Sequence, residues 1–512
     1  MTQKTYPDST SVDYVYDLVS KILQVNDPTG SYSFAYDNMG RLIGTTTQYS
    51  FLPGYYANAY AYDAASNRIG MSAPDGSTNL YSYDTLNRLS SLTNSLTGQF
   101  GFSYDALGRR IQLARPNGVN TNYTYDSVSH LLSVLHQAGS TTLDGASYTY
   151  DYAGNRTSKT NYLTGTTSNY GYDAIYELLS ATGGATESYS YDAVGNRLSS
   201  AGVPSYSYNS SNELTQNSTG SYTYDANGST LSDAQGRSYT WDFENRLVQA
   251  VNPTAGTTTF KYDPFGKRIQ KSGPLGTTNY LYDRSNLVET VNGSGGEVAG
   301  YTQGQKLDET LAEFQGSTSD YYEKDGLGSV TSLSISTGTL ANTYTYDSFG
   351  DVTKLTGTLP NPFEYTGREF DQETSVDYYR ARYYDPAIGR FLSEDPIGFR
   401  GGIDFYAYVR NNPANLTDPK GLQAPVCPPN SVMCTIKLCD LNPDTTKKCE
   451  CFCNASPLPD PTECEKNCEN CYSKNPSAQD VCLCLCKMGW HSQDCALTCC
   501  GVFGWAKCKC KK

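Results

Sequence analysis

The chain has 512 residues, among them 45 Tyr and 46 Gly but only 16 Phe and 5 Met, and 18% of its residues are charged. This length is ample for a large buried core or several domains. The net charge of −14 argues against nucleic acid and anionic membranes as partners. No run of about 18 apolar residues indicates a membrane span.

The composition also predicts the class of secondary structure. Tyr and Thr favour β-strands, whereas Gly, Asn, Asp and Pro favour turns, so we expect an all-β fold. The N-terminal segment MTQKTYPDSTSVDYVYD lacks the apolar stretch that a secretory signal needs. Because a strand pattern begins near residue 12, we expect the chain to be either the C-terminal part of a longer protein or an abbreviated copy.

A Tyr-Asp pair recurs through the first 355 residues, with four successive copies 21 residues apart at Asp63, Asp84, Asp105 and Asp126. The unit reads Tyr-x-Tyr-Asp-x-x-Gly-x-Arg-Leu, as in residues 189–198. Alternation places both tyrosines on one face of a strand, and Asp with Gly makes a turn before Arg-Leu begins the return strand. Each unit is therefore expected to be a hairpin that stacks on its neighbours, giving about 30–40 strands in all.

The aromatic and histidine side chains of this array each have two interpretations. Rows of tyrosine can form a platform for carbohydrate, but Tyr at strand spacing more often packs across strands with its hydroxyl at the wet surface, and we favour the packing role. His130 stands where a unit normally has Arg, and His136 follows in the same unit. With no cysteine or second acidic cluster nearby, we interpret both as surface strand residues rather than ligands.

Two Asp-Pro-x-Gly units, which begin at Asp395 and Asp418, stand between residues 390 and 422. Such units form turns anywhere. Two carboxyl groups in a poorly hydrated site, however, share a proton, so that one activates a water while the other protonates a leaving group. The peptide within reach is the one between Leu422 and Gln423. Asp395 and Asp418 are therefore candidate catalytic residues for a single self-cleavage, and Arg390 either orients the reacting groups or makes a simple ion pair.

The last 90 residues differ sharply from the rest. They hold all 17 cysteines, ten lysines, no arginine and nine acidic residues, a net charge of +1, so the first 422 residues carry −15. Cys449-x-Cys-x-Cys and Cys464-x3-Cys recur as Cys482-x-Cys-x-Cys and Cys495-x3-Cys, which indicates a duplicated module. Alternating cysteines suit disulfides or a thiolate metal cluster, with His491 a further candidate ligand. Disulfides are favoured in an exported protein.

The repeats resemble the YD repeats of Rhs proteins, of the C component of insecticidal toxin complexes and of teneurins. Residues 325–330 resemble the Asp-His-Leu-Gly-Ser motif of Rhs proteins, with Gly in place of His, and residues 364–371, 378–385 and 389–422 resemble the Rhs repeat-associated core. The resemblance covers residues 12–422. It implies a spiralling, hollow β-shell closed at one end by the core, whose aspartyl autoprotease cuts after the Leu of Asp-Pro-x-Gly-Leu and keeps a variable C-terminal segment inside. Asp418 to Leu422 reproduces that motif, and Asp395 matches the upstream partner.

These observations divide the chain into a YD-repeat shell (1–355), a repeat-associated core with the autoprotease motif (356–422) and a cysteine-rich variable tip (423–512). Two functions are consistent with this division. In the first, a toxin-delivery shell encloses the tip as cargo and releases it by self-cleavage. In the second, a secreted or cell-surface scaffold displays the tip as a binding module and is not cleaved.

Beyond a single cut, the sequence gives no sign of enzymatic turnover. Nucleotide-binding loops, zinc-protease motifs and Gly-x-Ser-x-Gly elbows do not occur, so we expect no cofactor and no metal at the cleavage site. The expected partners are an upstream YD-repeat shell or a secretion-system protein, with the tip as cargo. The expected location is secreted or at the cell surface, reached by a route that does not use an N-terminal signal peptide.

Overall fold

The computed structural model of the chain describes residues 2–184, 186–422, 481–486, 495–500 and 505–507, with backbone alone in the last three segments. The chain divides into two compact units, of which the first comprises residues 1–396 and 403–422. The second unit contains η2 (Gly398–Arg400) and an antiparallel sheet of β41 (Val481–Cys486), β42 (Cys495–Cys500) and β43 (Trp505–Lys507). Gln423, His491 and the predicted cysteine pairing lie outside the described residues and side chains.

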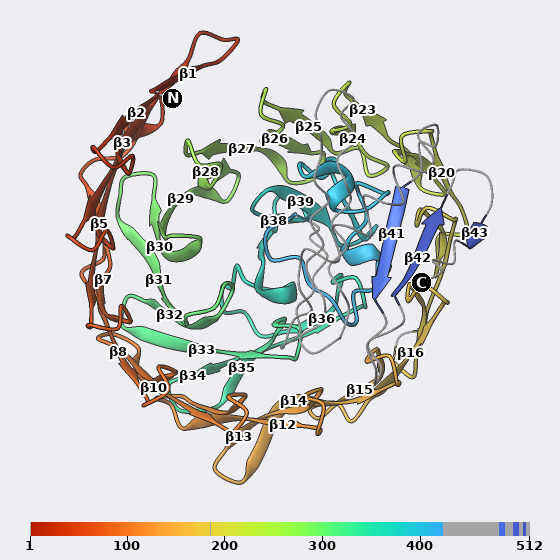
Figure 1. The fold of residues 1–512 in the computed structure, drawn as a ribbon, viewed down its shortest axis with the longest axis horizontal. Coiled ribbons are helices and arrows are strands. Elements are labelled where there is room, and N and C mark those ends of the chain that lie inside the picture. The colour runs from red at the N-terminus through yellow and green to blue at the C-terminus, as the bar shows by residue number, and fades with distance from the viewer. Residues whose placement is uncertain (1, 185, 423–480, 487–494, 501–504, 508–512) are drawn as a thin grey trace. The chain divides into compact units, whose positions relative to one another are not determined.

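The first unit begins with a 19-stranded antiparallel sheet, the outer ribbon, in which each strand pairs with the next one along the chain. In Figure 1 this ribbon follows an arc along the outside of the unit. Its strands are β1 (Gln3–Thr5), β2 (Ser11–Tyr16), β3 (Ile22–Asp27), β4 (Gly30–Tyr36), β5 (Leu42–Tyr49), β6 (Tyr56–Tyr62), β7 (Arg68–Ser72), β8 (Thr78–Tyr83), β9 (Leu89–Asn94), β10 (Gly98–Tyr104), β11 (Arg110–Ala114), β12 (Val119–Tyr125), β13 (Leu131–Ala138), β14 (Thr141–Tyr150), β15 (Arg156–Asn161), β16 (Thr167–Tyr172), β17 (Leu178–Thr182), β18 (Glu187–Tyr191) and β19 (Arg197–Ser200).

A small sheet of β20 (Tyr206–Tyr208), β21 (Leu214–Asn217) and β22 (Gly220–Ser221) leads to a 14-stranded antiparallel sheet, the inner ribbon. Its strands are β23 (Thr223–Tyr224), β24 (Thr230–Ser232), β25 (Ser238–Trp241), β26 (Leu247–Asn252), β27 (Gly256–Tyr262), β28 (Arg268–Gly273), β29 (Gly276–Asp283), β30 (Asn286–Asn292), β31 (Glu297–Gln303), β32 (Thr310–Gln315), β33 (Thr318–Lys324), β34 (Val330–Ile335), β35 (Leu340–Tyr346) and β36 (Val352–Thr356). These strand counts confirm the all-β prediction and the hairpin array.

The chain then forms a compact closing module. It consists of η1 (Tyr365–Gly367), the four-stranded sheet β37 (Glu369–Asp371), β38 (Val376–Tyr379), β39 (Arg382–Asp385) and β40 (Arg390–Phe391), and η3 (Val409–Asn411). Its aromatic side chains pack on one another and are buried from solvent. The cluster contains Tyr365, Tyr379, Tyr384, Phe391 and Tyr408. Buried aromatic pairs of this kind give the module a rigid centre.

Most Tyr-Asp units form the turn that the motif predicts, and the unit around Asp105 shows why the residues are needed. The Asp105 carboxylate accepts the backbone N–H groups of Leu107 (3.0 Å) and Arg109 (2.9 Å), which closes the turn. The Arg109 side chain donates back to Asp105 (2.6 Å), stacks over Tyr125 of the next unit at 4.7 Å and donates to the Asp126 carbonyl (2.9 Å). The Arg side chain, held by the Asp of its own turn, therefore links one hairpin to the next.

The two tyrosines of a unit have different roles. The first is buried between the ribbons in most units, as at Tyr81 and Tyr148. The second donates its hydroxyl to a main-chain carbonyl of the preceding unit, as Tyr104 does to Leu89 at 2.9 Å. Trp241, which replaces a second tyrosine, keeps this donor by bonding from Nε1 to the Thr230 carbonyl at 2.7 Å. The predicted cross-strand packing of the tyrosines is confirmed. The prediction that their hydroxyls point to solvent is wrong for the second tyrosine, because its hydroxyl bonds to a main-chain carbonyl that needs a donor.

The two histidines of one unit also differ. His130 makes two of the contacts of the usual Arg: its Nδ1 lies 2.8 Å from the Asp126 carboxylate and its ring stacks on Tyr150 at 4.7 Å. His136 is not a surface residue as predicted, because the inner ribbon covers it and leaves its side chain 1% exposed. It is bonded to the Thr121 hydroxyl (2.8 Å), and burial lowers its pKa to about 4.

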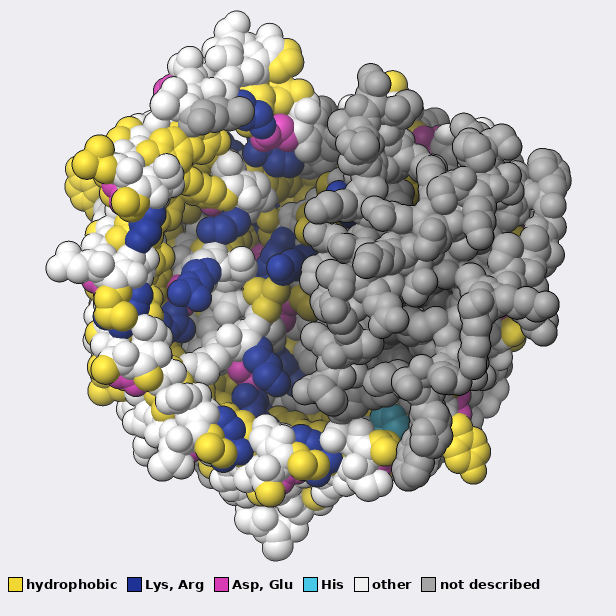
Figure 2. Space-filling view, viewed as in Figure 1, with side chains coloured by type: hydrophobic (Ala, Val, Ile, Leu, Met, Phe, Trp, Pro, Cys, Tyr) yellow, Lys and Arg dark blue, Asp and Glu magenta, His cyan; other side chains and the backbone are white. Residues whose placement is uncertain are grey.

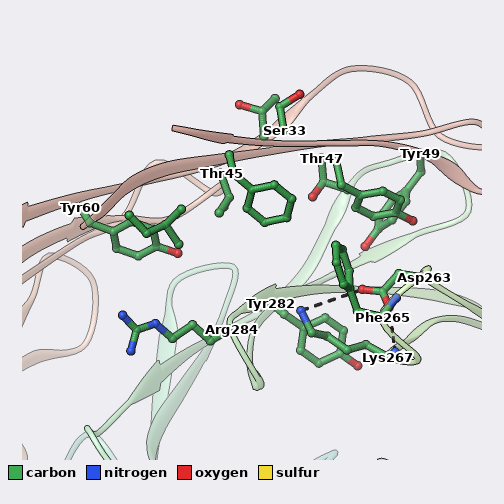
Figure 3. Close-up of a pocket in the computed structure, with 14 residues that line it drawn as sticks. Ser33, Thr45, Thr47, Tyr49, Tyr60, Asp263, Phe265, Lys267, Tyr282 and Arg284 are labelled. Carbon is green, nitrogen blue, oxygen red and sulfur yellow. Dashed lines mark hydrogen bonds and ion pairs between the residues drawn. The ribbon is translucent and has the colours of Figure 1, made fainter. Parts of the chain in front are cut away.

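The inner ribbon packs against the concave face of the outer ribbon, and residues of both form joint hydrophobic clusters. Hydrogen bonds cross the seam: the Tyr49 hydroxyl donates to the Tyr280 carbonyl and the Tyr321 hydroxyl to the Thr97 carbonyl, both at 2.9 Å. A cavity of about 130 Å³ remains in the seam, and Figure 3 shows Tyr49 of the outer ribbon near Asp263 of the inner one. Within the part of the chain described, no helix has the length and apolar character that crossing a membrane requires.

Candidate active site

The closing module brings the two predicted aspartates together. Asp395 follows β40, and Asp418 begins the turn that ends at Gly421. Their side chains are buried, with 4% and 5% of the residue exposed. Carboxyl groups at this depth require a partner, because an isolated charge loses most of its hydration.

That partner is Arg382 at the start of β39. Its guanidinium Nη2 lies 3.2 Å from Asp395 Oδ2 and 3.3 Å from Asp418 Oδ2. The two carboxyl oxygens are therefore at most about 6.5 Å apart, the sum of these distances. Arg382 itself is 1% exposed and lies flat on the Phe391 ring, 3.5 Å from the ring centre. A fixed cation between two buried carboxyl groups holds their separation and orientation.

The same groups hold the Gly421–Leu422 peptide, which directly precedes the bond that the sequence marks for cutting. Asp418 Oδ1 accepts the backbone N–H of Leu422 at 3.0 Å, and Arg382 Nε donates to the Gly421 carbonyl at 2.6 Å. The turn is further tied to the β38–β39 loop by a bond from the Ala381 N–H to the Lys420 carbonyl at 3.2 Å. Leu422, the last residue that the structure describes in this unit, thus stands directly beside the aspartate pair.

Arg390, the arginine singled out from the sequence, lies elsewhere in the module. It binds Asp404 with both guanidinium nitrogens, at 2.9 and 3.2 Å, and donates to the Asn212 carbonyl at 2.8 Å. The structure therefore gives it the ion-pair geometry that was the alternative interpretation. The sequence analysis did not single out Arg382, although this residue belongs to segment 378–385. Two buried carboxylates require a cation nearby, and this requirement could have directed attention to the arginines of that segment.

The protonation of Asp418 is shifted by its surroundings. Burial raises the pKa of Asp418 above its usual value, the positive charge of Arg382 opposes this shift, and the charge of Asp395 adds to it. A raised pKa keeps a proton on Asp418 at higher pH than in water. One carboxyl group can then act as acid while the other acts as base.

An open hollow of about 590 Å³ adjoins Leu422. Four basic side chains line it, those of Arg246, Lys267, Arg380 and Lys420. Figure 2 shows dark-blue basic side chains gathered in the hollow of this face. The hollow gives water access to the Leu422 side of the site, which a hydrolytic step requires. Among the described side chains, no group of three or more His, Cys, Asp or Glu is arranged to hold a metal ion.

Two curved ribbons of Tyr-Asp hairpins, followed by a module with a buried aspartate pair, define a YD-repeat shell protein of the Rhs type. The family model described as teneurin YD-shell matches residues 145–413, more than half of the chain, and one described as RHS repeat matches residues 83–121. The chain belongs to this family.

Curated relatives share parts of this sequence. The tRNA nuclease WapA of Bacillus subtilis strain 168 is 34% identical over 172 residues, which is 32% of this chain and 7% of WapA. The toxin subunit YenC2 of Yersinia entomophaga is 52% identical over 58 residues, 11% of this chain and 6% of YenC2. The chain thus spans less than a tenth of the length of these two relatives.

Solved structures share the fold. The crystal structure of TcdB2-TccC3 superposes with a TM-score of 0.70 at 21% identity, covering 82% of this chain and 26% of that one. The Tc holotoxin pore of Photorhabdus luminescens also gives a TM-score of 0.70, at 20% identity, covering 83% and 25%. At such identities the likeness shows the fold alone.

Proposed function

We propose that this protein is a toxin-associated shell that cuts its own chain once, between Leu422 and Gln423, and so separates the cysteine-rich tip from the shell. The observation that carries the proposal is the contact of one arginine, Arg382, with both buried aspartates while Asp418 binds the N–H of Leu422. A turn alone does not need a second buried carboxyl group. Sequence shared with the toxin subunit YenC2 and with the tRNA nuclease WapA supports the coarser role of a toxin-associated shell.

The chemistry follows from two carboxyl groups that share one proton. The ionised carboxylate takes a proton from a water, whose oxygen attacks the Leu422 carbonyl carbon. The protonated carboxyl group donates to the Gln423 nitrogen as the peptide bond breaks. The products are the Leu422 carboxylic acid and the Gln423 amine, which become carboxylate and ammonium by exchange of one proton, and the pair ends with one proton as it began. Because the substrate is part of the same chain, Arg382 and the Asp418 contact supply the orientation in advance.

The proposed role includes export and partners. The relative named as a toxin subunit and the likeness to the Tc holotoxin support an exported shell that associates with other toxin components, such as an upstream YD-repeat protein. After the cut, the tip stays with the shell as cargo. Co-elution of both fragments from a sizing column without denaturant is the expected result, and their separation would contradict retention.

Replacement of each aspartate tests the cut. Asp395→Asn and Asp418→Asn keep the side-chain volume but remove the acid–base pair, so each chain should stay intact while the unchanged protein yields two fragments. Because Asp-Pro bonds break in acid, the new N-terminus must be read by mass: Gln423 supports the proposal, whereas Pro419 indicates acid cleavage during preparation. Cutting at Gln423 in both variants at the normal rate would refute it.

A further inference from the structure

An exposed aliphatic side chain stands at the tip of most Tyr-Asp turns of the outer ribbon, two residues after the Asp. Because the strands alternate in direction, all these turns lie on one edge of the ribbon, which we call the Tyr-Asp rim. The side chains are between 38% and 72% exposed, and they are Val19, Met39, Leu86, Leu107, Val128, Ile175 and Val194. Figure 2 shows yellow side chains in separate spots around the left and lower edge, several beside dark-blue ones.

The turn itself does not require an aliphatic residue at this position. It uses the backbone N–H, which donates to the Asp carboxylate from Leu86 (2.9 Å) and Leu107 (3.0 Å). Polar residues at the same position make the same bond elsewhere in the chain: Asn227 at 2.9 Å and Gln235 at 3.0 Å. The aliphatic side chains on the rim are therefore unexplained by the fold of the hairpin.

In the inner ribbon the same position makes contacts between ribbons. Phe265, two residues after Asp263, packs edge-on against Tyr32 and Phe34 of the outer ribbon, at 6.0 and 5.8 Å between ring centres. Phe349, two residues after Asp347, is 1% exposed and packs on Tyr189 at 5.0 Å. At these two turns an apolar tip residue thus serves as a contact point with the outer ribbon.

The spacing of the rim limits what fits it. Successive turns are two strands apart, about 10 Å, so the aliphatic knobs repeat at that interval. Another Tyr-Asp rim has the same period, and its knobs fit between those of the first. Nine turns at this spacing and about one turn wide present about 800 Å² per copy, the size of a standard protein interface.

Part of the negative charge on the rim is neutralised within the turns. Three Asp carboxylates pair with an arginine of their own turn: Arg41 (2.7 Å), Arg88 (2.7 Å) and Arg109 (2.6 Å). At these three turns, two copies that each carry a net charge of −14 can approach without bringing unpaired carboxylates together. An edge of equal curvature related by a two-fold axis gives a closed, self-complementary contact.

We propose that the Tyr-Asp rim is an interaction surface that takes the rim of a second copy of this chain. Two copies meet edge to edge, with the aliphatic knobs of one between the turns of the other. The inference does not depend on self-cleavage.

Sedimentation velocity over a hundredfold range of protein concentration tests it. The unchanged protein should form a dimer, and the triple variant Leu86→Asn, Leu107→Asn, Val128→Asn should weaken it about tenfold or more, since each change removes a buried aliphatic contact. The matched control, Leu96→Asn with Leu163→Asn, places the same change on exposed leucines (52% and 43%) of turns at the opposite edge and should leave the dimer unchanged.

Three outcomes would overturn the proposal. The unchanged protein could stay monomeric throughout, or the dimer could be weakened by the control and not by the rim variant. The third outcome concerns binding to vesicles of anionic or zwitterionic lipid. If the unchanged protein binds the vesicles as a monomer and the rim variant does not, the Tyr-Asp rim is a lipid-binding surface instead. Both variants should fold, because polar residues already occupy this turn position at Asn227 and Gln235. Circular dichroism of each variant checks this.

Discussion

Arg382 touches both aspartates of the candidate active site and also the carbonyl before Leu422. A single side chain thus sets the distance between the two acids and the position of the peptide. Planar, forked guanidinium donors suit this task better than a single ammonium group. The rate of cutting should depend on its shape as well as on its charge.

Replacing Arg382 with Lys tests this dependence. The charge remains, but the bonds to the Gly421 carbonyl and to one carboxyl group are lost, and we expect self-cleavage to slow by about a hundredfold or more. The matched variant is Arg390→Lys, in the same module but bonded to Asp404. It should cut at nearly the normal rate. The fraction cut against time after cell-free synthesis gives both rates, and the opposite ranking would assign the role to Arg390.

Gly421 supplies a second test at the residue scale. Its φ is +63°, and a Cβ there would lie 2.2 Å from the Tyr379 carbonyl oxygen, a backbone atom that cannot swing aside. Gly421→Ala should therefore displace Leu422 from the aspartates and reduce the cleavage rate about a hundredfold. A control is Gly398→Ala, whose φ of +57° is similar but whose Cβ meets nothing within 4 Å. Equal rates in the two variants would show that the turn does not position the peptide.

At the scale of the element, the Asp-to-Arg link explains why the repeat tolerates some changes. The residue three positions after Asp has a positive φ, and Asn87 (+56°) or Ser129 (+74°) takes the place of Gly there. The Arg position accepts His130 because imidazole also reaches the Asp carboxylate and stacks on the next tyrosine. Gly and Arg therefore vary more along the array than Tyr and Asp do.

His130→Arg should stabilise this turn. An arginine would regain the bond to the next Asp carbonyl that Arg109 makes to Asp126 and would carry its charge at every pH. We expect the free energy of unfolding to rise by about 0.5 kcal/mol at neutral pH. Urea denaturation measures the change, with Arg109→His as the reciprocal variant, expected to lose a similar amount. A loss of stability in His130→Arg would show that the link is specific to each hairpin.

The hairpins and their turns could be predicted from the sequence because each is a local pattern with a local cause. The burial of His136 could not, since it follows from the inner ribbon, whose Lys324 carbonyl lies 3.2 Å from its Nε2 and 188 residues further along the chain. The same holds for Arg382: the loop at Arg380, whose φ is +61°, interrupts strand alternation, so spacing did not indicate which arginine faces the aspartates. Local motifs identified the acids, and tertiary packing selected their cation.

On the scale of the whole molecule, the inner ribbon holds carboxyl groups that burial keeps protonated. Burial raises the pKa of Glu289 and of Glu313 to about 8, aided by Asp75 and Asp320 respectively. Each group binds its proton more tightly in the folded chain than in the unfolded one. Their contribution to stability is fully present below about pH 4.5 and is lost as the pH rises through about 8.

Stability should therefore fall between about pH 4.5 and about pH 8 and level off above, by an amount on the order of several kcal/mol in all. Glu313→Gln should flatten this decline, because the amide oxygen still accepts the Tyr322 hydroxyl (2.8 Å from the native carboxylate) but does not ionise. The urea midpoint of both proteins at a series of pH values makes the comparison. Parallel curves would show that ionisation of Glu313 is not linked to unfolding.

The central claim, self-cleavage by the aspartate pair, is tested most directly by the intact mass of the freshly purified, unchanged protein under denaturing conditions. The account predicts two polypeptides, one that ends at Leu422 and one that begins at Gln423, whose masses add up to that of the chain plus one water. A single polypeptide with the full mass, from protein shown to be folded, would contradict it.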